Sequence, residues 1–256
     1  MIEYSARSHV GRVRGNNEDN LYADGVILTS QNREQPFTID GVTACPAIFA
    51  VCDGMGGEEN GEFAAMTAVQ NLLAADSAIK AEDCTRLGET LQQLINDINE
   101  SIHSYTLTYN KRAGTTLALA VITESGAYCF NMGDSRIYAL HKDCFRQITN
   151  DYTPDGLAGS KLTRCIGIGD ISTVEAYTPI PCNSRILLCS DGLTDMVSAA
   201  EIESILRVSQ RTVNAADYLL NTALVNGGED NITVIVADIK TSRISFLDGL
   251  AKKLKG

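Results

Sequence analysis

Apolar runs in the first fifth of the chain predict three β-strands. They cover residues 2–10, 21–28 and 47–52, and the third run is apolar from its first residue to its last. A continuous run of this length is typical of a strand that is buried on both faces. Residues 29–43 are mainly polar and include Pro36 and Gly41. They predict a long hairpin connection between the second and third strands.

A second group of apolar runs begins near residue 115. Four short runs separated by turn sequences predict an antiparallel meander. Further strands are predicted beyond a loop-like stretch at 150–161. The runs of this group cover residues 115–123, 127–132, 135–140, 145–149, 174–177, 186–189 and 232–239.

Helices are predicted wherever apolar residues recur at three- and four-residue spacing. Two long helices follow residue 58, and two more are predicted at 198–207 and 214–225. The stripes of the long helices are Phe63, Met66, Val69 and Leu73 in the first, and Leu91, Leu94, Ile95, Ile98, Ile102, Tyr105 and Tyr109 in the second. Because pairs of helices follow each block of strands, we predict an α+β fold of two packed sheets with helices outside.

Composition narrows the class of protein. The 256 residues carry a formal net charge of −11 at pH 7, which excludes nucleic acid as the main partner because a phosphate backbone needs a basic face. No two of the eight cysteines have the spacing of a zinc or thioredoxin-like motif. No signal peptide is visible, and no apolar run approaches the roughly 20 residues of a spanning helix. We expect a reduced, cytoplasmic protein without a membrane span.

Acidic residues recur at the ends of the predicted strands. Any one of them is better explained as a turn former, at odds of roughly two to one. If the two sheets pack face to face, however, these ends can converge, and a group of carboxylates stays ionised together only with cations. Oxygen ligands without paired His or Cys favour Mg²⁺ or Mn²⁺. The residues are Glu18, Asp19, Asp53, Asp134, Asp191 and Asp230.

Other routes to hydrolysis lack their sequence signatures. The chain has no Gly-x-Ser-x-Gly elbow, no phosphate-binding loop of the Walker type and no Cys-x5-Arg loop. Its three histidines, His9, His103 and His141, are scattered. Covalent-phosphatase and phosphate-loop routes therefore lack support, whereas two hard cations at ~3.5–4 Å can activate a shared water and clamp a phosphoryl group.

Seven segments, in order, resemble the metal-dependent protein phosphatases of the PP2C (PPM) family in their bacterial form. Together they cover residues 1 to about 240. The segments are Arg14-Gly-Asn-Asn-Glu-Asp19, Asp53-Gly-Met-Gly-Gly57, Ala113-Gly-Thr-Thr116, Asn131-Met-Gly-Asp-Ser-Arg136, Leu162-Thr-Arg164, Ser190-Asp-Gly-Leu193 and Gly228-Glu-Asp-Asn-Ile-Thr233.

The resemblance implies a four-layer α-β-β-α sandwich of two mainly antiparallel sheets with a binuclear Mn²⁺ or Mg²⁺ centre. By position, Asp53 bridges both ions and the carbonyl of Gly54 serves one of them. Asp191 and Asp230 hold one ion, and Glu18 faces the other directly or through water. Arg14 matches the family's phosphate-binding arginine, and Asp134 with Asp191 matches a third, weaker metal position. These roles come from the resemblance.

Two departures from the family pattern affect the expected chemistry. Met55 occupies the position where eukaryotic members carry a histidine proposed as general acid, so no residue is assigned to protonate the leaving group. The substrate-side flap, at about 150–161, is shorter than usual, and the family's common Asp-His-Ser reads Asp151-Tyr152-Thr153. Substrate choice and use of the third ion depend on this flap. We expect one PP2C-like domain over 1–241 and an amphipathic helical tail over 242–256.

The expected activity is hydrolysis of phosphoserine and phosphothreonine in proteins by attack of a metal-bridging hydroxide. Phosphorylated proteins are the expected partners of a monomer that opposes a cognate serine/threonine kinase. Two alternatives stay open: a pseudophosphatase that binds phosphoproteins as a regulator, and a phosphatase of small phosphate esters or anti-sigma-factor antagonists. The presence of Asp53, Asp191 and Asp230 argues against the pseudophosphatase.

Overall fold

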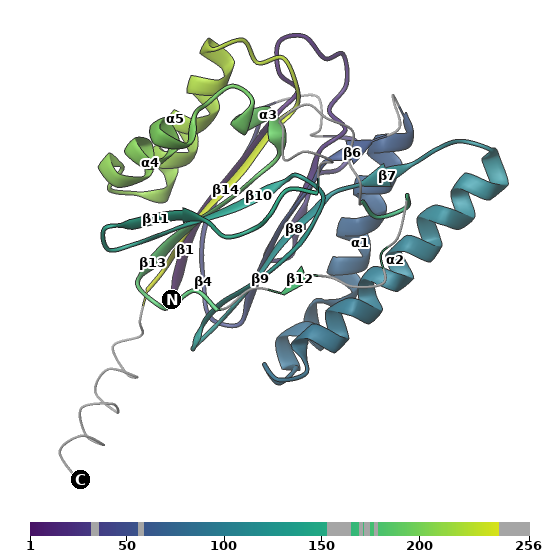
Figure 1. Cartoon of the computed structure of the whole chain (residues 1–256), viewed down its shortest axis with the longest axis horizontal. Helices are drawn as coiled ribbons and strands as arrows, with labels where there is room; N and C mark the ends of the chain where they lie inside the picture. The colour runs from purple at the N-terminus through teal and green to yellow at the C-terminus, as the bar shows by residue number, and fades with distance from the viewer. Residues whose placement is uncertain are drawn as a thin grey trace.

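Two six-stranded sheets form the centre of the protein, as Figure 1 shows for a computed structural model. The structure describes residues 1–31, 36–55, 59–152, 165–168, 171, 175–176 and 179–240. Neighbouring strands are antiparallel at every pairing in both sheets. The predicted fold of two mainly antiparallel sheets with helices outside is therefore confirmed.

The first sheet joins the two ends of the described chain, because β1 pairs along its whole length with β14. Its strand order is β11-β10-β13-β14-β1-β4. The bounds are β1 Ile2–His9, β4 Phe37–Thr43, β10 Arg136–His141, β11 Cys144–Gln147, β13 Ser184–Cys189 and β14 Ile232–Ile239.

The second sheet has the order β12-β9-β8-β5-β2-β3. Its central strand β5 is buried at every residue, as its continuous apolar run predicts. The bounds are β2 Asn20–Ala23, β3 Val26–Ile27, β5 Ala47–Cys52, β8 Leu117–Thr123, β9 Gly126–Met132 and β12 Glu175–Ala176, with the short pair β6 Gly54–Met55 and β7 Gly114–Thr115 beside it.

The helices cover the outer faces of the sheets and complete four layers (Figure 1). The second sheet packs on α1 (Glu59–Ala81) and α2 (Leu87–Tyr109). The first sheet packs on α3 (Asp191–Thr194), α4 (Ala199–Val208) and α5 (Thr212–Val225). A third apolar core fills the space between the sheets. No helix of the described residues is long and apolar enough to span a bilayer.

The helical stripes are only partly as predicted. In α2 the predicted Leu91, Ile95, Ile98 and Ile102 are buried. In α1 the predicted Val69 is buried but the predicted Leu73 is 42% exposed, and the rest of the buried face is made of Ala64, Ala65, Ala68 and Leu72. A stripe of alanines lets α1 lie close to the sheet, and large residues alone do not reveal it.

The predicted hairpin connection at 29–43 is wrong in its second half. Residues 37–43 form the edge strand β4, which pairs with β1. Thr38, Asp40 and Val42 are exposed in alternation with partly buried residues. Because an edge strand needs only one apolar face, half of the residues in β4 are exposed and mainly polar, and its sequence resembles that of a loop. The single strand predicted at 21–28 is likewise the β2–β3 hairpin, turned at Asp24 and Gly25 with positive φ at both.

The predicted meander is interrupted at Gly133. Strand β9 belongs to the second sheet and β10 to the first, so the Gly133–Asp134 turn carries the chain from one sheet to the other. Gly133 has a φ of 108°, which favours glycine. Such a crossing looks the same as a hairpin in sequence.

The strand register places every candidate carboxylate at one end of the sandwich. In the second sheet, residue 20 of β2 pairs with residue 52 of β5, and residue 51 of β5 pairs with residue 118 of β8. Residue 117 of β8 pairs with residue 132 of β9. Glu18, Asp53 and Asp134 therefore lie at the same end of this sheet. In the first sheet 189 pairs with 136 and with 234, which brings the Asp191 and Asp230 ends to β10. Most of the flap (153–164) and the tail at 242–256 lie outside the described residues, so both expectations stay predictions.

Candidate metal centre

Asp53 follows directly on the buried strand β5. Its backbone N–H donates to Thr116 Oγ1 at 2.8 Å, and its carbonyl accepts from Thr116 N at 2.9 Å and Thr115 Oγ1 at 3.0 Å. These bonds attach the end of β5 to the segment between β7 and β8. They fix the backbone of Asp53, so the carboxylate extends from a rigid support.

Asp191 is the acidic residue whose charge acts most strongly on Asp53. Burial raises the pKa of Asp53 well above its ordinary value, and the charge of Asp191 raises it further. Burial, followed by the charges of Asp134 and Asp230, raises the pKa of Asp191 to about 7. Without a cation, the pair therefore holds a proton near neutral pH.

Three more carboxyls around this pair are harder to ionise than usual. Burial raises the pKa of Glu18 to about 7, and that of Asp134 to about 6. Asp195, one helical turn after Asp191, also has a pKa raised first by burial. Asp195 was not among the predicted site residues, although its i, i+4 spacing from Asp191 could have indicated it.

Arg14 contacts a predicted metal ligand. Its Nη2 donates to Asp230 Oδ2 at 2.6 Å, with side chains that are 57% and 36% exposed, respectively. Its Nε and Nη1 make no hydrogen bond within the described residues. The guanidinium can therefore bind a second anion without breaking any other contact.

Two buried polar residues that sequence reasoning missed hold the site together. The Asn231 side chain accepts from Glu18 N at 2.7 Å and donates to the carbonyls of Val10 and Asn16, both at 2.9 Å. It thereby fixes the loop that carries Arg14 and Glu18 beside Asp230.

Ser190 is the second of these residues, and it fixes the backbone directly before Asp191. Its Oγ donates to Asp19 Oδ2 at 2.8 Å and accepts from Thr233 N at 3.0 Å. Ser190 directly precedes Asp191, and Asn231 directly follows Asp230. A polar residue next to each candidate ligand was therefore the sequence signal that could have indicated these two supporting residues.

Gly54 has a packing reason to be glycine. A Cβ on this residue would overlap the carbonyl of Gly61 in the first turn of α1 and the carbonyl of Glu18. Gly61 in turn faces the backbone of Gly54. The absence of both side chains lets α1 begin directly against β6. The family resemblance accounts for a glycine at position 54 only through the use of its carbonyl as a metal ligand.

The oxygen-rich end of the sandwich fits divalent cations. Asp191 Oδ1 is buried without a hydrogen-bond partner in the described part of the chain, and a buried acceptor of this kind needs a partner. Yet no three His, Cys, Asp or Glu side chains among the described residues are grouped to hold one ion. Asp53 interacts with Asp191, whereas Asp230 forms an ion pair with Arg14. Ion binding through all three aspartates therefore needs a rearrangement of these side chains, and we expect Asp230 to exchange Arg14 for the cation.

Metal-free protein should lose stability as pH rises from about 4 to about 7. Asp191, Glu18 and Asp134 have folded-state pKa values of about 7, 7 and 6, above the roughly 4 of unfolded carboxyls. The folded state thus binds more protons in this window, and deprotonation favours unfolding. In EDTA we expect the Tm to fall by roughly 5–10 °C between pH 5 and pH 7.5. Excess Mn²⁺ should reverse the fall, and a metal-free Tm that rises or stays constant would contradict this electrostatic picture.

Comparison with known proteins gives one consistent result. A sequence profile described as Protein phosphatase 2C matches residues 30–226. The chain is 33% identical over 252 residues to the serine/threonine phosphatase stp of Listeria innocua, covering 91% of this chain and 94% of that protein. It is 28% identical over 256 residues to the protein phosphatase PhpP of Streptococcus pneumoniae, covering 93% and 98%.

A solved structure is similar over nearly the whole chain. It is the catalytic domain of the serine threonine protein phosphatase PstP in complex with two manganese ions. The TM-score is 0.75 at 28% identity, and the match covers 94% of this chain and 100% of that chain.

Proposed function

The chain belongs to the protein phosphatase 2C family in its bacterial form, a family of metal-dependent serine/threonine protein phosphatases, and we propose that its buried acidic end hydrolyses phosphoserine and phosphothreonine in proteins. The observation that carries the proposal is the Asp53–Asp191 pair, in which the charge of Asp191 raises the pKa of Asp53 and the buried Asp191 Oδ1 has no hydrogen-bond partner among the described residues.

In this proposal Asp53 would help to hold both of two Mn²⁺ or Mg²⁺ ions. Asp191 and Asp230 would hold one, the Gly54 carbonyl would serve one, and Glu18 would face the second directly or through water. Asp134 with Asp191 offers a third, weaker position. When bound, the ions supply a water acidic enough to attack phosphorus and positive charge for the phosphoryl oxygens. Cations also relieve the repulsion that raises the carboxyl pKa values.

The side chains of the protein do the binding and orienting. Asp53 and Asp191 are supported by the Thr116 and Ser190 contacts, so the acidic pair stays in place as charge changes. Arg14 offers a planar pair of donors that matches two phosphate oxygens. Met55 carries no ionisable proton, so it cannot act as the acid for the leaving alkoxide.

Arg14→Ala is expected to lower kcat/KM for a phosphothreonine peptide by about 10- to 100-fold, mainly through KM. A hydrogen bond to a charged group is worth roughly 1.5–3 kcal/mol, which corresponds to this range. Arg14→Lys should recover part of the loss, because it keeps the charge without the fork. The matched control is Arg12→Ala, which removes an exposed arginine two residues away. If both alanine variants behave alike, Arg14 has no specific phosphate contact.

Steady-state assays test the proposal. The full chain with Mn²⁺ should hydrolyse p-nitrophenyl phosphate and a phosphothreonine peptide, and EDTA or Asp53→Ala should remove both activities. Mn²⁺-dependent turnover no higher than that of Asp53→Ala would support a pseudophosphatase. A kcat/KM much higher for small esters than for any phosphopeptide would support the small-ester alternative. We propose phosphoproteins as substrates and a serine/threonine kinase as the opposing enzyme.

A further inference from the structure

Residues 149–152, the root of the flap, are hydrogen-bonded to the turn that carries Asp134. Tyr152 N donates to the Gly133 carbonyl at 3.0 Å. Asn131 Nδ2 donates to the carbonyls of Asn150, at 3.0 Å, and Gly133, at 3.3 Å. The described start of the flap and the 131–135 turn therefore form one hydrogen-bonded unit.

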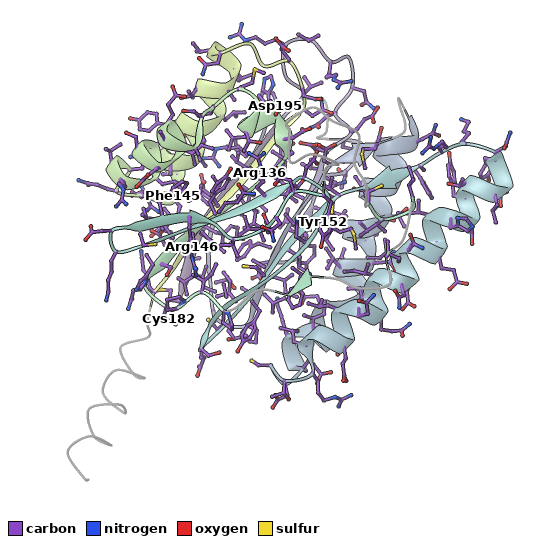
Figure 2. The ribbon with its side chains drawn as sticks, viewed as in Figure 1. Arg136, Phe145, Arg146, Tyr152, Cys182 and Asp195 are labelled. Carbon is purple, nitrogen blue, oxygen red and sulfur yellow. The ribbon has the colours of Figure 1, made fainter. Side chains whose placement is uncertain are left out.

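An ion pair closes this unit on its outer side. Arg136 Nε lies 3.1 and 3.0 Å from the two oxygens of Asp151, and Nη2 lies 2.6 Å from Asp151 Oδ2. The Arg136 and Asp151 side chains are only 19% and 12% exposed, and Gln147 Nε2 donates to Asp151 Oδ1 at 2.9 Å. Figure 2 labels Arg136 between Asp195 and Tyr152. A fork of this kind fixes direction as well as distance.

The other side of the turn is attached to the metal centre. Ser135 Oγ and Thr116 Oγ1 are 2.6 Å apart, and Thr116 Oγ1 also accepts from Asp53 N. A side chain at Gly133 would overlap Thr116. The turn that carries Asp134 is thus connected to Asp53 through Ser135 and Thr116, and to the start of the flap through Gly133 and Arg136.

We infer that Arg136 and Asp151 are positioning residues that hold Asp134 toward Asp191 and so determine the affinity for a third divalent ion. The inference rests on the proposed function, since the third ion is part of it. In this inference Asp151, at the start of the flap, has the role of orienting Asp134 through Arg136.

A second ion pair of the same kind provides a matched control. Arg185 Nε lies 2.6 Å from Asp238 Oδ1, and its Nη2 lies 2.9 Å from Oδ2. The Arg185 and Asp238 side chains are 10% and 16% exposed. Arg136 pairs in register with residue 189, whereas Arg185 pairs with residue 140. The control therefore lies four residues away along β13, roughly 13 Å from the site end.

The experiment compares Asp151→Asn with Asp238→Asn in the full chain. Mn²⁺ binding is followed by calorimetric titration and by the electron paramagnetic resonance signal of free Mn²⁺, and thermal unfolding is recorded in EDTA. We expect similar losses of Tm in both variants. Only Asp151→Asn should weaken the weakest Mn²⁺ binding step, by about five- to tenfold. Arg136→Lys, which keeps the charge, should shift the same step less and provides a milder variant.

A double-variant cycle distinguishes positioning from independent effects. If Asp151 acts through Asp134, Asp151→Asn should add nothing to the binding defect of Asp134→Ala. Additive defects, an equal defect in Asp238→Asn, or a wild-type chain that never binds a third equivalent of Mn²⁺ would each overturn the inference. The absence of Mn²⁺-dependent turnover in the wild type would instead contradict the proposed function. The two failures are distinguishable because the binding measurements do not depend on activity.

Discussion

Asp53→Asn is expected to abolish Mn²⁺-dependent phosphatase activity and, at the same time, to stabilise the metal-free protein. Activity should fall at least about a thousandfold, because the electrostatic contribution of bound ions is worth several kcal/mol. Stability should rise at pH 7.5, because the amide removes the cost of burying the Asp53 carboxyl beside Asp191, a cost that is paid either as repulsion or by taking up a proton. Thermal unfolding in EDTA and phosphopeptide hydrolysis in Mn²⁺ measure the two effects.

The matched control for Asp53→Asn is Asp143→Asn, which makes the same change of charge at an exposed position between β10 and β11. It should alter neither activity nor the Tm in EDTA. Mn²⁺ should raise the Tm of wild type and Asp143→Asn but not of Asp53→Asn. An Asp53→Asn protein that is less stable than wild type in EDTA would show that Asp53 serves packing rather than cation binding.

Gly54→Ala has the second large expected effect, a loss of roughly 3 kcal/mol of stability together with the loss of activity. The added Cβ would overlap the carbonyls of Gly61 and Glu18. Both are backbone groups, so relief requires α1 or the Glu18 loop to move away from β6. Movement of the Glu18 loop displaces a proposed metal ligand, and movement of α1 shifts Gly61, which lies against the Glu18 carboxylate. Urea denaturation and Mn²⁺ titration measure the two consequences.

Gly88→Ala controls for the general effect of replacing a glycine. Nothing lies within 4 Å of a Cβ on Gly88, near the start of α2. Alanine there should change stability by less than about 1 kcal/mol, in the favourable direction. If Gly54→Ala retains wild-type stability and Mn²⁺ affinity, the close approach of α1 to β6 does not constrain the site.

Much of the fold was predictable because its central elements carry unmixed patterns. The continuous apolar run of β5, the stripe of Ile95, Ile98 and Ile102 in α2, and the β-branched residues of β14 each indicate one structure. Elements with mixed patterns were missed or incomplete. Edge strand β4 is half polar, and α1 packs through alanines.

The site was predictable in its acidic residues but not in the contacts between them. Strand ends and ordered motifs indicate Asp53, Asp191 and Asp230, yet nothing local to Gly133 shows that the chain changes sheets there. The Arg14–Asp230 contact joins residues 216 positions apart. The supporting bonds of Asn231 and Ser190 likewise depend on which loops meet, and that is a property of the assembled sheets.

We propose that the acidic end of the sandwich holds two divalent ions that share Asp53. Crystals of the full chain grown with MnCl₂ and measured on both sides of the manganese absorption edge test it most directly. We expect two anomalous peaks about 3.5–4 Å apart, with Asp53 contacting both and Asp230 released from Arg14. Manganese absent from Asp53, or bound only at surface carboxylates while Arg14 stays on Asp230, would contradict it.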